Sequence, residues 1–351
     1  MNASTQLPAS GHHAKEHPDI DRTPAVPLAG GAGATGPAEQ GGEAAPAATA
    51  GEHASAARVP EVLKADCIAD SAGGLTFDLN APQDLPTAWS AALVLRRRGS
   101  EKEANGGTDG TDEEVRLPLG PNGSGQLRAV LPSTVALAEG RWNAYADLGD
   151  GQDPRRLLPG VNDLRSLVDR RPLTGIGRLG VRIPYATKFG NLALRSWLRG
   201  PHAEAGDILV APDGLTVSGR LYGAVPADGA RAEARARRSA PADGGSASGT
   251  PVVVTAPLTV DGARFTFTLP LEELAGRWKR GSEPWDLWLR PAEGARPVRI
   301  ARLLDDIADK KQVFSYPALA VQAPAGQVKV GPYYTLDNDL AIRVAGPADE
   351  A

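Results

Sequence analysis

The sequence contains a single cysteine, Cys67, and few aromatic residues, which make up 5% of its 351 residues. A lone cysteine cannot form an internal disulfide, so nothing points to an oxidising compartment. No segment approaches the ~18 apolar residues of a membrane span, and the N-terminal region lacks the apolar run of about 7–15 residues that a signal peptide needs. We therefore expect a cytoplasmic protein with no membrane span, in which Cys67 is a buried structural residue.

A strong charge of either sign is also lacking, since the formal net charge is −4. The six acidic and three basic residues of positions 1–58 contribute −3 of this, which leaves −1 for the rest of the chain. So weak a global field favours no nucleic-acid partner and no anionic membrane.

The first 58 residues are rich in Ala, Gly, Pro, Ser and Thr and contain no aromatic residue. Such a segment cannot bury enough apolar surface to offset roughly 1–2 kcal/mol of backbone entropy per residue. We predict a disordered tail over residues 1–58. His12 and His13 lie in it, and we favour solvated histidines over a weak metal site.

The remainder of the chain repeats itself. Gly74-Leu75-Thr76 recurs as Gly214-Leu215-Thr216, and Trp142 and Arg156 align with Trp285 and Arg299. The clearest match lies between residues 184–195 (PYATKFGNLALR) and 332–343 (PYYTLDNDLAIR), which are identical at six of twelve positions. The order of the matched blocks is preserved, which predicts two copies of one domain, at 59–200 and 201–347.

Local patterns within each copy indicate strands. Residues 265–269 and 285–289 alternate, and turn residues interrupt the short apolar runs every 8–15 residues. The fold class we predict is all-β, with tandem duplicated β-sandwich domains preceded by the disordered N-terminal tail. We expect a strand over 298–302 followed by helical turns to Asp309, a short helical turn over 164–168, and long polar hairpin loops over 100–112 and 239–250.

Catalytic motifs are missing. The chain has no Gly-Lys pair for a P-loop and no Gly-x-Ser-x-Gly elbow. We interpret His202 as part of a linker between the domains. We expect a non-enzymatic protein with no catalytic residues, no cofactor and no metal. The weak calcium candidates Asp337 and Asp339 fit a turn before the last strand better.

Exposed aromatic and basic residues are the remaining candidates for ligand binding. Trp142 and Trp285, present in both copies, are expected in the core. The arginines of 96–98 and Arg235 fit solvated strand ends better than contacts to a phosphate-bearing polymer. The candidate ligand-binding residues are Trp278, Trp288, Tyr334, Arg237 and Arg238.

A resemblance adds to this picture. Residues 298–317 (VRIARLLDDIADKKQVFSYP) and 330–344 (VGPYYTLDNDLAIRV) resemble the C-terminal β-sandwich region of actinobacterial glycosyltransferases of cell-wall glycopolymer synthesis. They are also similar to stand-alone proteins that accompany such enzymes. The resemblance implies an accessory module for cell-envelope polysaccharide assembly, which binds glycan or docks a glycosyltransferase.

Two alternatives stay open. The chain could be a carbohydrate-active transferase whose fold brings carboxylates together, the first suspects being Glu272, Glu273, Asp305 and Asp306. It could also be a structural protein that self-associates through β edges. The sequence does not choose the ligand or the oligomeric state.

Overall fold

The computed structural model describes residues 62–80, 90–99, 113–168, 170–172, 177–237 and 252–347. This part of the chain is almost entirely β-strand, and the predicted all-β class is confirmed. The tail at 1–58 and the two long loops at 100–112 and 239–250 lie outside the described residues.

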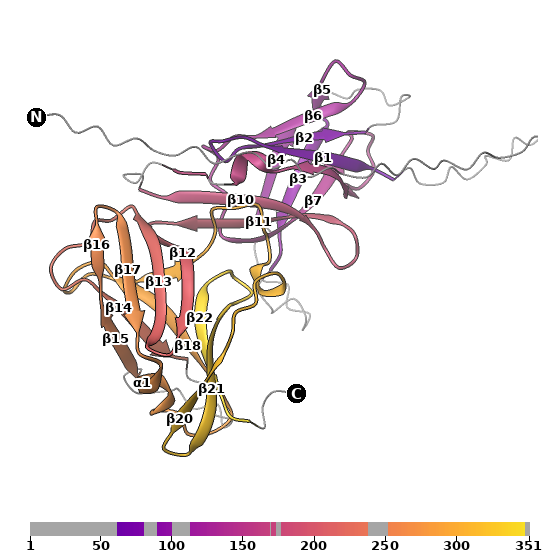
Figure 1. Cartoon of the computed structure of the whole chain (residues 1–351). Helices are drawn as coiled ribbons and strands as arrows, with labels where there is room; N and C mark the ends of the chain where they lie inside the picture. The colour runs from indigo at the N-terminus through magenta and orange to yellow at the C-terminus, as the bar shows by residue number, and fades with distance from the viewer. Residues whose placement is uncertain are drawn as a thin grey trace, which may run out of the picture. The chain divides into compact units, whose positions relative to one another are not determined.

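The first half contains two sheets. One has the strand order β5 (Gly120–Pro121), β6 (Leu127–Leu131), β2 (Leu75–Leu79), β1 (Lys64–Ala69) and β9 (Leu158–Asp163), with β1 and β9 parallel. The other has the order β10 (Leu179–Ala186), β11 (Leu192–Arg199), β7 (Gly140–Asp147), β3 (Ala92–Arg97) and β4 (Glu114–Pro118), and β8 (Arg155–Arg156) pairs with β7 (Figure 1).

The second half repeats this pattern of strand pairing. Its first layer has the order β16 (Thr259–Asp261), β17 (Arg264–Leu269), β13 (Gly214–Tyr222), β12 (His202–Ala211) and β19 (Val298–Ala301), with β12 and β19 parallel. Its second layer comprises β20 (Leu319–Ala323), β21 (Gly326–Tyr334), β22 (Leu340–Ala345), β18 (Ser282–Arg290), β14 (Arg231–Ala236) and β15 (Val253–Pro257). Because β19 also pairs with β18, the two layers form one continuous sheet.

The register agrees with the repeat found in the sequence. Leu75 pairs with Leu131 in the first half, and Leu215 pairs with Leu269 in the second. The last strand of the first half, β11, ends at Arg199, and the first strand of the second half, β12, begins at His202. The domain limits at 59–200 and 201–347 stay a prediction.

Each half has its own apolar core because strands bury every second side chain. Along β17 the residues Phe265, Phe267 and Leu269 are buried and those between them are exposed. Trp142 and Trp285 are fully buried, one in each core, as expected. Burying such a side chain contributes about 1.5–3 kcal/mol.

Cys67 is buried in β1, which confirms its predicted place. Burial, together with the charge of Asp66, raises the pKa of its thiol to about 12. The thiol is therefore kept protonated, and a role as a nucleophile is disfavoured.

The prediction for residues 303–309 was wrong. A strand ends at Ala301, but no helical turn follows at once, and a 3-10 helix forms only over Lys310–Gln312. The carboxylate of Asp305 accepts hydrogen bonds from the Ile307 amide and from Lys310 Nζ, so it competes with helical backbone bonds. The predicted turn over 164–168 is present as a 3-10 helix at Arg165–Leu167.

His202 was also misinterpreted as linker. It is the first residue of β12 and is fully buried, with Nε2 2.7 Å from Glu204 Oε2. Glu204 in turn accepts hydrogen bonds from the amides of Leu303 and Leu304. A short α-helix that the sequence did not predict, α1 (Leu271–Ala275), follows β17. In the described residues no helix has the length and apolar character to cross a membrane.

Candidate functional site

The two halves carry equivalent clusters in which an aromatic ring lies between two arginines. In the first half the guanidinium carbons of Arg96 and Arg156 lie 5.1 and 4.8 Å from the ring centroid of Tyr145. In the second half the guanidinium carbons of Arg235 and Arg299 lie 5.2 and 5.0 Å from the ring centroid of Trp288. Cation–π contacts of this kind hold each guanidinium over a ring face.

The strand alternation explains how these clusters form. Along β7, Trp142 and Ala144 face the core, so Arg141, Asn143 and Tyr145 share the opposite face. Along β18, Trp285 and Leu287 face the core, which places Pro284, Asp286 and Trp288 on that face in the same way.

One position distinguishes the two clusters. Asn143 Oδ1 accepts hydrogen bonds from Arg98 Nε at 2.8 Å and from Arg156 Nη2 at 3.0 Å. The equivalent residue in the second half is Asp286, which forms ion pairs with Arg237 and, at 2.8 Å, with Arg299. In the second half the carboxylate of Asp286 thus offsets the charge of the two arginines. In the first half the amide of Asn143 leaves that charge in place.

The first pocket, of about 640 Å³, lies beside the Asn143 cluster. Its basic lining comprises Arg98, Arg141, Arg156, Lys188 and Arg195, and the acidic side chain that the structure places in this lining is Asp309. Within the described residues, Arg98, Arg141 and Arg156 form no ion pair. The pocket therefore has a net positive charge.

Two aromatic rings also line the first pocket. Tyr185 stands near the end of β10, and Phe189 lies in the turn between β10 and β11 with 77% of its surface exposed. Lys188 Nζ lies 4.8 Å from the Phe189 ring centroid. Apolar rings next to fixed charges are typical of ligand-binding pockets.

Neighbouring positive charges act on one another in this pocket. Burial lowers the pKa of Arg156, and the charge of Arg98 lowers it further. Burial likewise lowers the pKa of Arg195, with Arg141 adding to the effect. Both side chains remain charged at neutral pH. A bound anion would relieve this repulsion.

The second pocket, of about 510 Å³, is the equivalent hollow of the second half, where Tyr333 and Arg343 take the places of Tyr185 and Arg195. Two of its guanidinium groups, those of Arg237 and Arg299, have an acidic partner in Asp286. Burial opposes ionisation of Asp286, but hydrogen bonds from Arg299 and Arg237 prevail and lower its pKa. An incoming anion would compete with this carboxylate, so the second pocket suits uncharged polar groups better.

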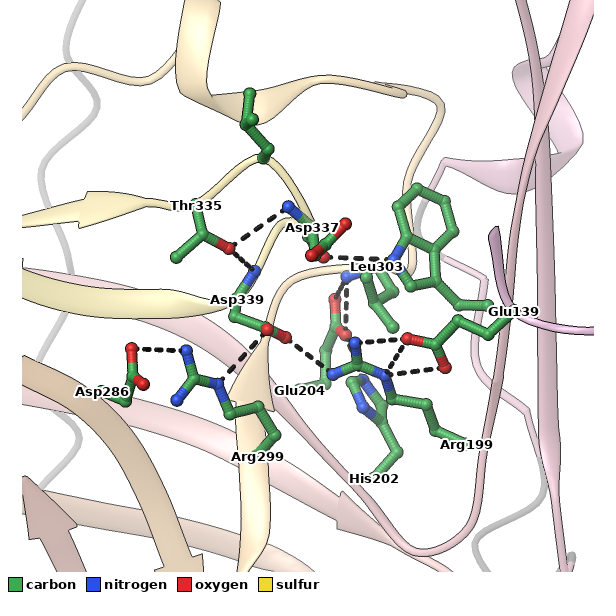
Figure 2. A network of polar contacts seen from close by, with 12 residues as sticks. Glu139, Arg199, His202, Glu204, Asp286, Arg299, Leu303, Thr335, Asp337 and Asp339 are labelled. Carbon is green, nitrogen blue, oxygen red and sulfur yellow. Dashed lines mark hydrogen bonds and ion pairs between the residues drawn. The ribbon is translucent and has the colours of Figure 1, made fainter. Parts of the chain in front are cut away.

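A polar network surrounds the loop from Thr335 to Asp339, which lines the second pocket (Figure 2). Arg199 donates to Glu139 and to Asp339, each at 2.7 Å, and Asp339 also contacts Arg299 at 3.3 Å. Trp197 Nε1 donates to the backbone oxygen of Asp337 at 3.1 Å.

The turn predicted before the last strand is present within this loop, since the hydroxyl of Thr335 accepts from the amides of Asp337 and Asp339. Asp337 is paired with Arg195 at 2.6 Å, and Asp339 with two arginines. Both carboxylates are thus paired with guanidinium groups.

The ligand-binding residues predicted from sequence are scattered. Trp278 is half-buried against the second core and donates to the Gly281 carbonyl, and the faces of Trp288 are covered by arginines. Tyr334 is fully buried against Phe314 and is closed to any ligand. Arg237 lines the second pocket, and Arg238 lies outside the described residues.

The carboxylates suspected of catalysis are not gathered in the described pockets. Glu272 and Glu273 are exposed on α1. Asp305 is buried and paired with Lys310 at 2.6 Å, and Asp306 is exposed. None of the four lines the first or the second pocket.

Sequence reasoning missed the main residues of the first pocket, namely Arg141, Asn143, Tyr185, Lys188 and Phe189. A signal for them was present in the aligned repeats. Three positions that are acidic in the second copy, Asp286, Asp337 and Asp339, are uncharged in the first, where Asn143, Phe189 and Asn191 stand.

Comparisons with known proteins add little. No family model and no curated protein matches the chain. Among solved structures it is similar to residues 217–571 of TarS from S. aureus, a staphylococcal cell-wall glycosyltransferase, with a TM-score of 0.24 and 11% identity over 59% of this chain. The match spans 55% of that structure, and nothing in it is specific to actinobacteria. Similarity at this level carries no inference about function.

Proposed function

We propose that this chain is a non-catalytic module of cell-envelope polysaccharide assembly that binds an anionic glycan in the first pocket. The observation that carries the proposal is that Arg98 and Arg156, which donate to Asn143, have no acidic partner in the described residues. Their counterparts in the second half pair with Asp286. Guanidinium groups bind phosphate and carboxylate through paired hydrogen bonds.

The aromatic lining supports a sugar-containing ligand over a bare anion. Tyr185 and the exposed Phe189 offer flat apolar surface next to the cations. A glycan with phosphate or carboxylate substituents presents both kinds of group, an apolar ring face and a charge.

The test is calorimetric titration of the full chain with three probes: a glycerol phosphate oligomer, an oligogalacturonate and a fully methyl-esterified oligogalacturonate. The first two carry phosphodiester and carboxylate charges, and the third is uncharged. We expect binding of a charged probe, weakened by added salt because salt screens exposed charges.

Variants locate the site. Arg98→Gln and Arg141→Gln should each weaken binding by about 10- to 150-fold, since a hydrogen bond to a charged group contributes about 1.5–3 kcal/mol. Lys64→Ala and Arg264→Ala remove an exposed charge from the other layer of each half and should leave binding unchanged.

Equal binding of the esterified probe would refute recognition of charge. Failure of all three probes would refute glycan binding in this pocket and would direct attention to docking of a glycosyltransferase, which a pull-down with such an enzyme would test.

A further inference from the structure

A third pocket, of about 590 Å³, lies on the second half around the turn at Gly281, between α1 and β18. Three of its basic lining residues, Arg277, Lys279 and Arg280, are exposed and form no ion pair within the part of the chain that the structure describes. The acidic lining residue is Glu283, whose Oε1 accepts from the Lys279 amide at 3.2 Å. This pocket, like the first, is cationic.

The three pockets are neighbours in the structure. The second and third share the lining residues Arg237, Ser282 and Pro284. The first and second meet at Arg195, which lines the first pocket and donates to the backbone oxygen of Leu336 and to Asp337, both in the lining of the second.

Charge varies along this path. Both outer pockets have several basic side chains without acidic partners among the described residues, whereas in the middle one Arg237 and Arg299 are paired with Asp286 and Asp339, and only Arg343 and Lys311 form no ion pair in the part of the chain that the structure describes. The path therefore has its most strongly cationic lining at its two ends and a partly neutralised lining between them.

We infer that the ligand is a linear polymer with repeated anionic groups, which lies across all three pockets and contacts both cationic ends at once. The inference rests on the proposed function and narrows its ligand class. Single anionic units bind each end separately, whereas one chain that reaches both gains affinity because its second contact is intramolecular.

The experiment titrates the full chain with a ladder of glycerol phosphate oligomers, from two repeat units upward, and measures affinity and stoichiometry. Short oligomers should bind two per chain. Long ones should bind one per chain and about 100-fold more tightly or better. The double variant Lys279→Ala/Arg280→Ala should reduce the stoichiometry of short oligomers to one and weaken binding of long ones by about 10- to 100-fold.

The charge-matched control is the double variant Lys64→Ala/Arg264→Ala, which should behave as the parent. An affinity that does not rise with length, or that the Lys279→Ala/Arg280→Ala variant leaves unchanged, overturns the continuous path while leaving the first pocket intact. Loss of all binding in Arg98→Gln alone also overturns it, because the third pocket should still hold a short oligomer. Failure of the parent to bind any charged probe refutes the proposed function itself.

Discussion

The substitution Asn143→Asp should weaken anion binding in the first pocket without unfolding the protein. It is isosteric and copies Asp286 of the second half. The new carboxylate would stand within hydrogen-bond distance of Arg98 and Arg156, where the amide oxygen now accepts at 2.8 and 3.0 Å. The new carboxylate would convert hydrogen bonds from charged donors into ion pairs and would offset the repulsion between the arginines, so thermal stability should hold or rise.

The magnitude follows from electrostatics. Two unit charges about 4 Å apart repel by about 1 kcal/mol in water and about 4 kcal/mol at an effective dielectric constant of 20. Because 1.4 kcal/mol corresponds to a factor of ten, affinity should fall by about 5- to 700-fold.

The assay is calorimetric titration with a glycerol phosphate oligomer of two repeat units, together with thermal melting of each variant. Asn143→Ala, which removes the hydrogen bonds without adding charge, serves as the comparison and should weaken binding less. Unchanged affinity in a folded Asn143→Asp protein would refute the reasoning.

Three further outcomes follow from the same contacts. Asp286→Asn should lower the free energy of unfolding by about 1–3 kcal/mol and give the second pocket weak anion binding, visible as an added site in titration; unaltered stoichiometry would contradict this. Burial opposes ionisation of Glu233, but hydrogen bonds from Arg290 and Arg235 prevail and lower its pKa. Its stabilisation is therefore present above the unfolded pKa of about 4.3 and is lost as pH falls through the folded value. Urea melts of Glu233→Gln between pH 3 and 6 should show a flatter pH dependence than the parent's, and identical slopes would argue against it. Cys67 should resist an aromatic disulfide reagent at pH 8 until denaturant is added, whereas rapid reaction of the native protein would show that the thiol is accessible.

The fold was predictable because its signals are local and repeated. Alternation at 265–269 reports one buried face directly, and the match of 184–195 with 332–343 reports the duplication. The misjudged segment, 303–309, has helical spacing in sequence. Its conformation depends on Glu204, about a hundred residues away, whose carboxylate accepts hydrogen bonds from the backbone amides of Leu303 and Leu304.

The first pocket was less accessible to sequence reasoning for a physical reason. Its arginines come from β3, β7, β8 and β11 or the residues beside them, and only strand pairing brings them together. Whether an arginine is free or paired depends on a single cross-strand neighbour, Asn143 or Asp286. Trp278 and Trp288, which the sequence offered as exposed binding residues, instead pack against the second core or contact arginines.

The most direct test of the central claim is a nuclear magnetic resonance titration of arginine Nε–Hε signals with a short glycerol phosphate oligomer. Arg98 lines the first pocket, and Arg299 lines the second, where it is paired with Asp286. Our account predicts that the Arg98 signal shifts on binding while the Arg299 signal stays in place. A shift of Arg299 with Arg98 unmoved would contradict it.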